Sequence, residues 1–279
     1  MGTGISILLA QSPENTPLSP GLAILFAFHP RPEPEQAAER RFITSAHLIH
    51  RGKIPDPRAA EAGSDFHFIE PDTSEETAAI LVRLVQERMP EGHHLDPIRD
   101  IQVLCPMSRG SIGVRELNTT LQTAPNPVRP GEPAAERFGW RFQVRDRDKV
   151  IQTENDYKKE VFNGDIGLIE KIDPVEQEVT IRFDYRLVGY DHGELDEVSL
   201  AYAVTIHKAQ GSEFLAVVIP VAMQHFMLLQ RNLIYTGIAR ANRLLVVVGQ
   251  WKALGFAVRN DQSRNRYSGL LSSLKEPGQ

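Results

Sequence analysis

The fold class of this chain is decided by two apolar runs, LAVVIPV at residues 215–221 and LLVVV at residues 244–248. Neither run alternates with polar residues, so both sides of each strand are expected to be buried. Between them lies a helical pattern whose apolar side carries Phe226, Leu229, Leu233, Ile234 and Ile238. Buried strands joined by helices are typical of a parallel sheet with helices on both faces. These residues therefore predict an α/β domain.

The same alternation of helices and apolar runs extends toward the N-terminus. A strand is predicted at 101–105 (IQVLC), and the helix after it carries Val114, Leu117 and Leu121 on one side. Another helix is predicted over 75–89, where Thr73 and Glu76 have the spacing of a capping box. An earlier helix is expected to end at Gly52, and its buried side carries Ala38, Phe42, Ala46 and Ile49.

The middle of the chain has a different, β-type pattern. A proline-rich stretch at 125–133 comes before it. Short strands are predicted at Val150–Gln152, Asp165–Ile172 and Val179–Phe183, with turns at Asn163-Gly164 and Asp173-Pro174. Roughly sixty residues of short strands suit a small barrel inserted between two strands of the α/β domain.

Composition narrows the function classes. The 279 residues carry 31 Lys and Arg and 36 Asp and Glu, a formal net charge of −5. This mild acidity argues against general nonspecific nucleic-acid binding but is compatible with a local DNA groove. The single cysteine, Cys105, excludes an internal disulfide and favours a reducing compartment, so a cytoplasmic location is predicted. The apolar runs fall far short of the ~20 residues that cross a bilayer, and no membrane partner is expected.

The sequence lacks the loop that normally holds ATP phosphates. Its Gly52-Lys53 pair is followed by Ile54 instead of Ser or Thr, so there is no Walker A loop. No apolar run ends in the Asp-Glu pair that would hold magnesium. His47 and His50 lack further ligands at metal-binding spacing, so no metal site is predicted.

Polar chemistry is concentrated first in residues 202–214, YAVTIHKAQGSEF. Thr205, His207 and Lys208 could donate hydrogen bonds to phosphates, and Gly211 would let a ligand approach the backbone. Taken alone, the segment would be interpreted by default as a polar helix end capped by glycine.

The second polar segment is residues 231–241, RNLIYTGIARA, directly before the run at 244–248. It places Arg240 at a helix end, where an arginine finger would stabilise charge on a transferring phosphoryl group. Taken alone, such an arginine is usually solvated and favoured there by the helix dipole.

Together, these two segments resemble motifs V and VI of superfamily 1 DNA helicases, most closely the RecD-like subgroup. The stretch IQVLCPMSRG at 101–110 is similar to motif IV. Residues 155–167 are similar to the small Src-homology-3-like barrel inserted in the second motor domain of that family. The resemblance covers residues 36–271, in the family's order.

The resemblance implies an α/β fold with a RecA-like parallel sheet of the P-loop NTPase type, without Walker A, and an inserted small Src-homology-3-like β-barrel. The expected divisions are an unmatched segment at 1–34, the first part of the second motor domain at 35–136, the barrel at 137–199 and the second part of the motor domain at 200–279. The implied function is that of the C-terminal half of an ATP-dependent 5′–3′ DNA helicase.

The resemblance also implies roles for single residues. Arg240 is expected to reach the γ-phosphate as the catalytic finger, and Glu213 to contact the ribose. Gln210 and Gly211 would bind on the nucleotide side and link it to the DNA side. The residues implied to contact DNA are Thr205, His207, Lys208, Ser108 and Arg109. ATP with Mg²⁺ would be shared with a Walker-A-bearing motor domain or subunit, and single-stranded DNA would be the other partner.

Two functions remain open at this point, and a third possibility is a decaying gene product with no activity. One is a helicase half whose ATP turnover needs a first motor domain in trans. The alternative is a catalytically inactive DNA-binding or protein-adaptor module derived from a helicase. The run at 137–149, where arginines and Lys149 interleave with Phe138, Trp140 and Phe142, would offer that module a surface for single strands. The same run could also be a strand with a solvated charged face.

Overall fold

The protein is described here by a computed structural model covering residues 41–56, 64–123, 125–127, 129–131, 133–135 and 144–261. Its centre is a five-stranded parallel sheet with the order β1-β12-β11-β2-β10. These strands are β1 (Phe66–Ile69), β2 (Ile101–Cys105), β10 (Ala203–Thr205), β11 (Phe214–Val221) and β12 (Ala241–Gly249). The parallel α/β sheet predicted from the apolar runs is confirmed.

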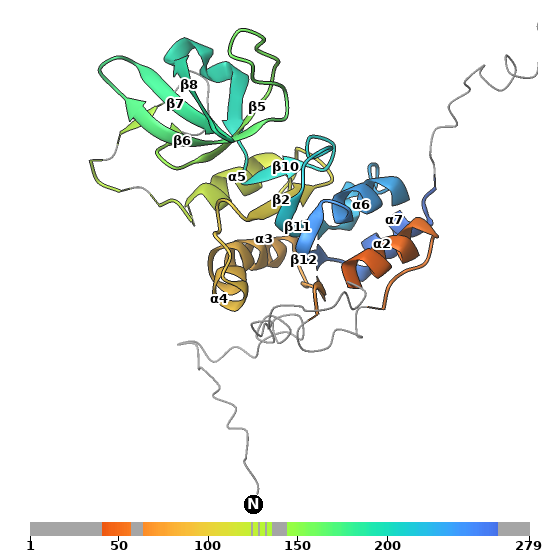
Figure 1. Cartoon of the computed structure of the whole chain (residues 1–279). Helices are drawn as coiled ribbons and strands as arrows, with labels where there is room; N and C mark the ends of the chain where they lie inside the picture. Colours follow the sequence, from red (N-terminus) through yellow and green to blue (C-terminus); the bar gives the residue numbers. More distant parts are fainter. Residues whose placement is uncertain are drawn as a thin grey trace, which may run out of the picture.

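Helices cover both faces of this sheet (Figure 1). One face carries α2 (Arg41–His50), α6 (Arg231–Ile238) and α7 (Trp251–Arg259). The other carries α3 (Ser74–Arg83) and α5 (Val114–Thr123), and α3 continues through the π-helical turn η2 (Leu84–Arg88) into α4 (Met89–His93). The result is a three-layer α/β domain.

Strand β12 shows how an apolar run becomes a strand buried on both sides. Leu245 and Val247 pack among α2, α6 and α7, whereas Leu244, Val246 and Val248 pack on the α3 side. None of these five side chains is more than 1% exposed. Full burial stabilises the fold by roughly 1.5–3 kcal/mol for each such side chain.

A second, antiparallel sheet is inserted between α5 and β10, with the order β8-β7-β6-β5-β9. Its strands are β5 (Lys149–Gln152), β6 (Ile166–Asp173), β7 (Glu178–Phe183), β8 (Arg186–Asp191) and β9 (Val198–Leu200), with the 3-10 helix η3 (His192–Glu197) before β9. A two-stranded ladder of β3 (Ala134–Ala135) and β4 (Val144–Arg145) precedes it. We call the β5–β9 unit the barrel domain.

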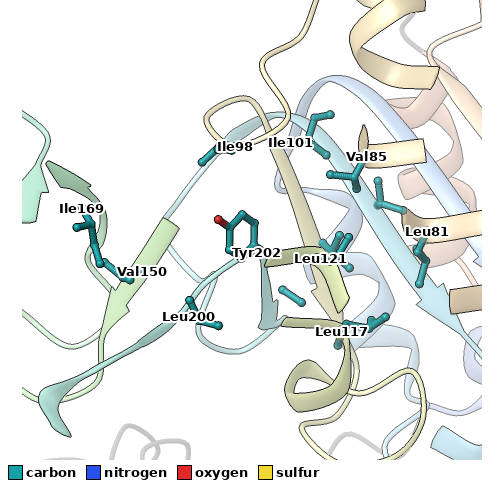
Figure 2. Packing of buried hydrophobic residues seen from close by; sticks show 14 of the residues in the cluster. Leu81, Val85, Ile98, Ile101, Leu117, Leu121, Val150, Ile169, Leu200 and Tyr202 are labelled. Carbon is teal, nitrogen blue, oxygen red and sulfur yellow. The ribbon is translucent and has the colours of Figure 1, made fainter. Parts of the chain in front are cut away.

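The two sheets share one hydrophobic core (Figure 2). Val150 and Ile169 of the barrel domain belong to the same buried cluster as Leu81 of α3 and Leu121 of α5. Tyr202, at the start of the chain's return to the parallel sheet, lies between the two groups in Figure 2. The barrel domain is therefore packed onto the α5 side of the central sheet.

The structure corrects several predicted elements. The helix predicted from Phe226 onward begins only at Arg231, after the 3-10 turn η4 (Met223–His225), and Phe226 is 52% exposed. The helix predicted over 75–89 extends through α4 to His93. Thr73 does accept the Glu76 N–H, but the Glu76 carboxylate accepts from the N–H of Asp72. Strands β1 and β10 of the parallel sheet and strands β8 and β9 of the barrel domain were not predicted. Ala38, residues 1–34 and residues 137–143 of the run at 137–149 lie outside the described residues.

Candidate nucleotide and nucleic-acid sites

Arg240 and Glu213 lie beside each other at the amino edge of the parallel sheet. Each comes directly before a strand, β12 or β11, and the two strands pair from Phe214 and Ala241 onward. The Arg240 guanidinium donates from Nη1 to the Ser212 carbonyl at 3.2 Å and from Nε to the Thr236 carbonyl at 3.3 Å. These two bonds tie the end of α6 to the segment before β11.

The Arg240 guanidinium keeps donors for a further acceptor. Its Nη2 makes no hydrogen bond to any residue that the structure describes, and the side chain is half-buried. The neighbouring Glu213 side chain is exposed. A planar guanidinium held by two carbonyls is pre-organised to meet an anion, since few rotamers remain to be fixed on binding.

At the opposite, carboxyl edge of the sheet, a cleft of about 620 Å³ lies between α5, β10 and the barrel domain. Three of the predicted DNA contacts, Ser108, Thr205 and Lys208, line it. The barrel domain contributes Ile151, Ser199 and Leu200. The remaining walls come from Val114, Arg115, Glu116, Asn118, Thr119, Ala203 and Val204.

The turn after β10 is built on Thr205. Its carbonyl accepts from the N–H groups of Lys208 and Ala209, at 3.0 and 3.2 Å, and its hydroxyl accepts from the Lys208 N–H at 3.3 Å. Residues 206–211 are therefore a compact turn and not the end of a helix. Gly211 has φ +93°, and the space where a Cβ would lie is open. Glycine is suited to this backbone conformation because it has no Cβ.

The two candidate sites are separated by the length of the sheet. In the register of the sheet, Thr205 of β10 pairs with Cys105 of β2, and Val103, two residues earlier in β2, pairs with Val218 of β11. Val218 is itself four residues after Phe214, where β11 begins. The amino and carboxyl edges are thus about six residues apart, or about 20 Å at ~3.3 Å per residue. The segment with Gln210 and Gly211 runs from one edge to the other.

Two predicted DNA contacts do not line the cleft. His207 and Arg109 are exposed and lie outside its walls. Gln210 is also exposed, on the connecting segment. The structure therefore brings together Ser108, Thr205 and Lys208 on one edge, and Arg240 with Glu213 on the other.

Sequence reasoning missed the side chains that hold β10 in place. Asn118 of α5 donates from Nδ2 to the carbonyls of Leu200 and Ala203, at 3.0 and 2.9 Å, and its Oδ1 accepts from the Ala203 N–H at 2.8 Å. Gln102 of β2 donates from Nε2 to the Ala201 carbonyl at 2.9 Å. The sequence did carry a signal for both residues, because Asn118 and Gln102 are polar residues at positions that the helical and strand patterns assign to the core.

A buried carboxylate, Asp148, joins the barrel domain to the central domain. It accepts from the Tyr202 hydroxyl at 2.7 Å, Asn126 Nδ2 at 2.8 Å, Gln122 Nε2 at 2.6 Å and the Arg145 N–H at 2.7 Å. Burial raises the pKa of the Asp148 carboxyl above its ordinary value, and the four donors oppose this rise. Burial also raises the pKa of the Tyr202 phenol, and the charge of the neighbouring Asp148 adds to this rise.

Lys149, the next residue, is only 3% exposed, and its Nζ donates to the Ile101 carbonyl at 3.1 Å. Its ammonium also lies 5.6 Å from the centre of the Phe214 ring. Burial lowers the pKa of Lys149 to about 8, against the opposing charges of Asp100 and Asp96. Asp148 and Lys149 therefore anchor β5 to the start of β2 and to the segment before β10.

Metal and thiol chemistry finds no support in the described part of the chain. It contains no group of three His, Cys, Asp or Glu side chains that could hold a metal ion. Cys105 is fully buried in β2, and burial raises the pKa of its thiol. Among the described helices, none has the length and apolar character needed to span a membrane.

Two family models match this chain. Residues 117–183 match the ATP-dependent RecD-like DNA helicase SH3 domain, and residues 200–248 match the UvrD-like helicase C-terminal domain. A crystal structure of Pif1 helicase from Candida albicans is similar over 86% of this chain and 59% of its own, at 15% identity and a TM-score of 0.46.

Among proteins with similar sequences are a RecD2 helicase and a RecD subunit. The ATP-dependent RecD2 DNA helicase of Deinococcus radiodurans is 32% identical over 276 residues, which is 96% of this chain and 36% of that protein. The RecBCD enzyme subunit RecD of Mycobacterium tuberculosis is 30% identical over 177 residues, 63% of this chain and 29% of that protein. This chain thus spans about a third of the length of these relatives. The two matched models follow one another along the chain and, with these relatives, support a RecD-like helicase C-terminal region, an α/β domain with an inserted SH3-like domain.

Proposed function

We propose that this chain is the second motor region of an ATP-dependent 5′–3′ DNA helicase and contacts both ATP and single-stranded DNA. The observation that carries the proposal is the division of polar groups between opposite edges of one sheet. Arg240 and Glu213 are at the amino edge, and the cleft with Thr205 and Lys208 is at the carboxyl edge. Coupling of nucleotide hydrolysis to strand movement needs a physical connection between the two sites, and here one sheet carries residues of both.

On the nucleotide side, Arg240 acts as an arginine finger in this proposal. Its guanidinium would stabilise the charge that develops on the transferring γ-phosphoryl group, and Glu213 would accept from a ribose hydroxyl. Gln210 and Gly211 would lie next to this site on the connecting segment. The phosphates and Mg²⁺ would be held by a first motor domain or subunit, because this sequence has no Walker A loop.

On the DNA side, the cleft would take the sugar-phosphate backbone of a single strand. The hydroxyls of Ser108 and Thr205 and the ammonium of Lys208 are donors that suit phosphate oxygens. Arg109 and His207, which are exposed, would contact the strand outside the cleft. The segment 206–213 joins this cleft to Arg240 through the Ser212 carbonyl, so a conformational change at one site could be transmitted to the other.

We also propose the domain divisions 35–136 and 200–279 for the motor domain and 137–199 for the inserted barrel domain. Strand β9, which pairs with β5, ends at Leu200, one residue beyond the boundary proposed between 199 and 200. Of the run at 137–149 that would support an adaptor function, residues 137–143 lie outside the described residues, and Lys149 at its end is buried. Retention of Arg240 against Ser212 favours the motor function over the adaptor.

ATP turnover in trans tests the nucleotide site. The chain alone is expected to hydrolyse no ATP, and addition of a RecD-like first motor domain should restore DNA-stimulated hydrolysis. Arg240→Ala should then lower the rate by about 10³-fold or more, the low end of what an arginine finger contributes. Arg259→Ala, at the exposed end of α7, is the matched control and should leave the rate unchanged. Equal rates for the two variants would contradict the assignment of Arg240.

DNA binding is tested by fluorescence anisotropy with a labelled oligothymidylate over a salt series. Lys208→Gln should weaken binding and reduce the salt slope by about 0.7, the value for one phosphate contact on a single strand. Lys252→Gln, an exposed lysine of α7, is the matched control. Failure of the unaltered chain to bind the oligonucleotide would overturn the DNA side of the proposal.

A further inference from the structure

The barrel domain carries an exposed aromatic pair close to the cleft. Tyr157 is 75% exposed and Phe162 is 45% exposed, and their ring centres lie 6.0 Å apart at an interplanar angle of 75°. Folded proteins normally bury such rings, because each carries a large apolar area. We call these two side chains the aromatic shelf.

The loop that presents the shelf is rigid. Asp156 and Val161 form a two-way backbone bridge at 2.8 and 3.0 Å, and the Asp156 carboxylate accepts the N–H groups of Lys158 and Lys159. The Phe162 N–H donates to Asp165 at 2.9 Å. The two rings are therefore held out of the core by a preformed loop, and little further ordering would be needed for them to bind a ligand.

Two more contacts brace this loop from outside. Lys159 Nζ bonds the Glu194 carboxylate at 2.6 Å, and Arg186 Nη2 donates to the Glu160 carbonyl at 2.7 Å. Lys158, directly before Lys159, is exposed and makes no ion pair with a described residue. A positive charge thus stands next to an aromatic surface.

The shelf adjoins the turn that carries Lys208. A Cβ placed on Gly164, two residues after Phe162, would lie 3.7 Å from the Lys208 carbonyl oxygen, so the barrel loop touches the turn after β10. Ile151 and Ser199 of the barrel domain already line the cleft. A strand that leaves the cleft past Lys208 would therefore reach the shelf next.

From this arrangement we infer that Tyr157 and Phe162 form a base-stacking subsite, on which bases of single-stranded DNA stack after their backbone has crossed the cleft at Lys208. The inference rests on the proposed DNA-binding function and adds a second, aromatic component to it. Base–aromatic stacking is tolerant of sequence, since every base has a π-face, and Lys158 supplies the charge for the neighbouring phosphate. The subsite would bind bases, whereas the cleft binds phosphates.

The test compares an oligothymidylate with the same oligonucleotide carrying a short block of abasic sites, by fluorescence anisotropy. Tyr157→Ala and Phe162→Ala should each weaken binding of the oligothymidylate by roughly fivefold or more, in line with the loss of one stacked base. The salt slope should stay unchanged, because no phosphate contact is removed. Tyr157→Phe should retain binding, and Phe256→Ala on α7 is the matched aromatic control.

The abasic block separates stacking from other roles of these rings. When the abasic block is placed at the position that reaches the shelf, it should weaken binding of the oligonucleotide by the unaltered chain. The same block should not weaken binding by the Tyr157→Ala variant any further. If Lys208→Gln weakens binding while Tyr157→Ala and Phe162→Ala do not, the shelf is refuted and the DNA cleft stands. If the two alanine variants instead lose only affinity for a first motor domain, the shelf is a protein contact and the inference is wrong. If the unaltered chain binds no DNA, the proposed function and this inference fail together.

Discussion

Replacement of Asp148 by alanine should strongly destabilise the protein and uncouple the barrel domain from the central domain. The carboxylate is fully buried and accepts four hydrogen bonds, two on each oxygen. The donors come from β4, from the end of α5 and the residues after it, and from Tyr202, three residues before Thr205. One side chain thus holds three separate segments around the junction.

The magnitude follows from the donors left without this acceptor. In the Asp148→Ala variant, Asn126 keeps its hydrogen bond to the Asp146 carbonyl at 2.9 Å, whereas the Tyr202 hydroxyl and the Arg145 N–H lose the Asp148 carboxylate as their acceptor. A buried polar group without a partner costs ~1–3 kcal/mol, so we expect Asp148→Ala to lower the free energy of unfolding by about 3 kcal/mol or more. Domains of this kind are stable by only ~5–15 kcal/mol in total.

Asp148→Asn keeps the shape of the side chain but replaces one acceptor with a donor that faces other donors. Its cost should be smaller, about 1–2 kcal/mol, because the Tyr202 hydroxyl can turn to accept. Asp184→Asn, in an exposed turn of the barrel domain, is the matched control and should stay within ~0.5 kcal/mol of the unaltered chain. Urea unfolding followed by tyrosine and tryptophan fluorescence measures all three variants.

The pH dependence gives an independent check. Because burial raises the pKa of Asp148, the folded state binds its proton more tightly than the unfolded state. Stability relative to Asp148→Asn should therefore decrease as the pH rises from about 4, the unfolded value, through the folded pKa. A difference that grows with pH would show that the four donors outweigh burial. A loss below ~1 kcal/mol for Asp148→Ala would refute the view that this network holds the junction.

Three other changes probe the fold. The buried Lys149 amine binds its proton more weakly in the folded than in the unfolded state, so the free energy of unfolding should rise between pH about 8 and the ordinary lysine pKa of 10.5. Lys149→Met should abolish this rise, and urea unfolding over that pH range measures it. An equal slope in both proteins would contradict the expectation. Gly249→Ala should cost more than ~3 kcal/mol, because its Cβ would overlap the Val221 carbonyl oxygen of the neighbouring strand, and a thermal midpoint near that of the unaltered chain would rule this out. Gly237→Ala in α6 should be neutral or stabilising by up to ~1 kcal/mol, since the new methyl would meet Cδ1 of Ile206 and of Ile219 at 3.1 Å and Cγ1 of Ile206 at 3.3 Å, which are flexible side-chain atoms and not backbone. Gly237→Val should destabilise, and a lower thermal midpoint for the alanine variant would contradict the first expectation.

The local elements of the central domain could be predicted because their signals are local. Strand β12 was predicted from an unbroken apolar run, which fits only a strand buried on both faces. The start of α3 was predicted from the spacing of Thr73 and Glu76, although the reciprocal bond comes from Asp72. Phe226 was misplaced because its apolar character matched the helical period, yet the chain makes a 3-10 turn there and α6 starts five residues later.

The residues by themselves thus determined the fold class, the three apolar strands β2, β11 and β12, and the polar groups available at 202–214 and 231–241. Only the tertiary structure decided that Arg240 meets Ser212 at one edge of the sheet, while Thr205 and Lys208 share a cleft at the other. It also decided that Asp148 and Lys149, which are charged residues in a β pattern, are buried at a junction instead of facing solvent. Hydrophobic periodicity reports which side of an element is apolar, whereas the partner of a polar atom is set by segments far away in the chain. Tyr202 and Asp148, 54 residues apart, acquire their contact only when the two sheets pack together.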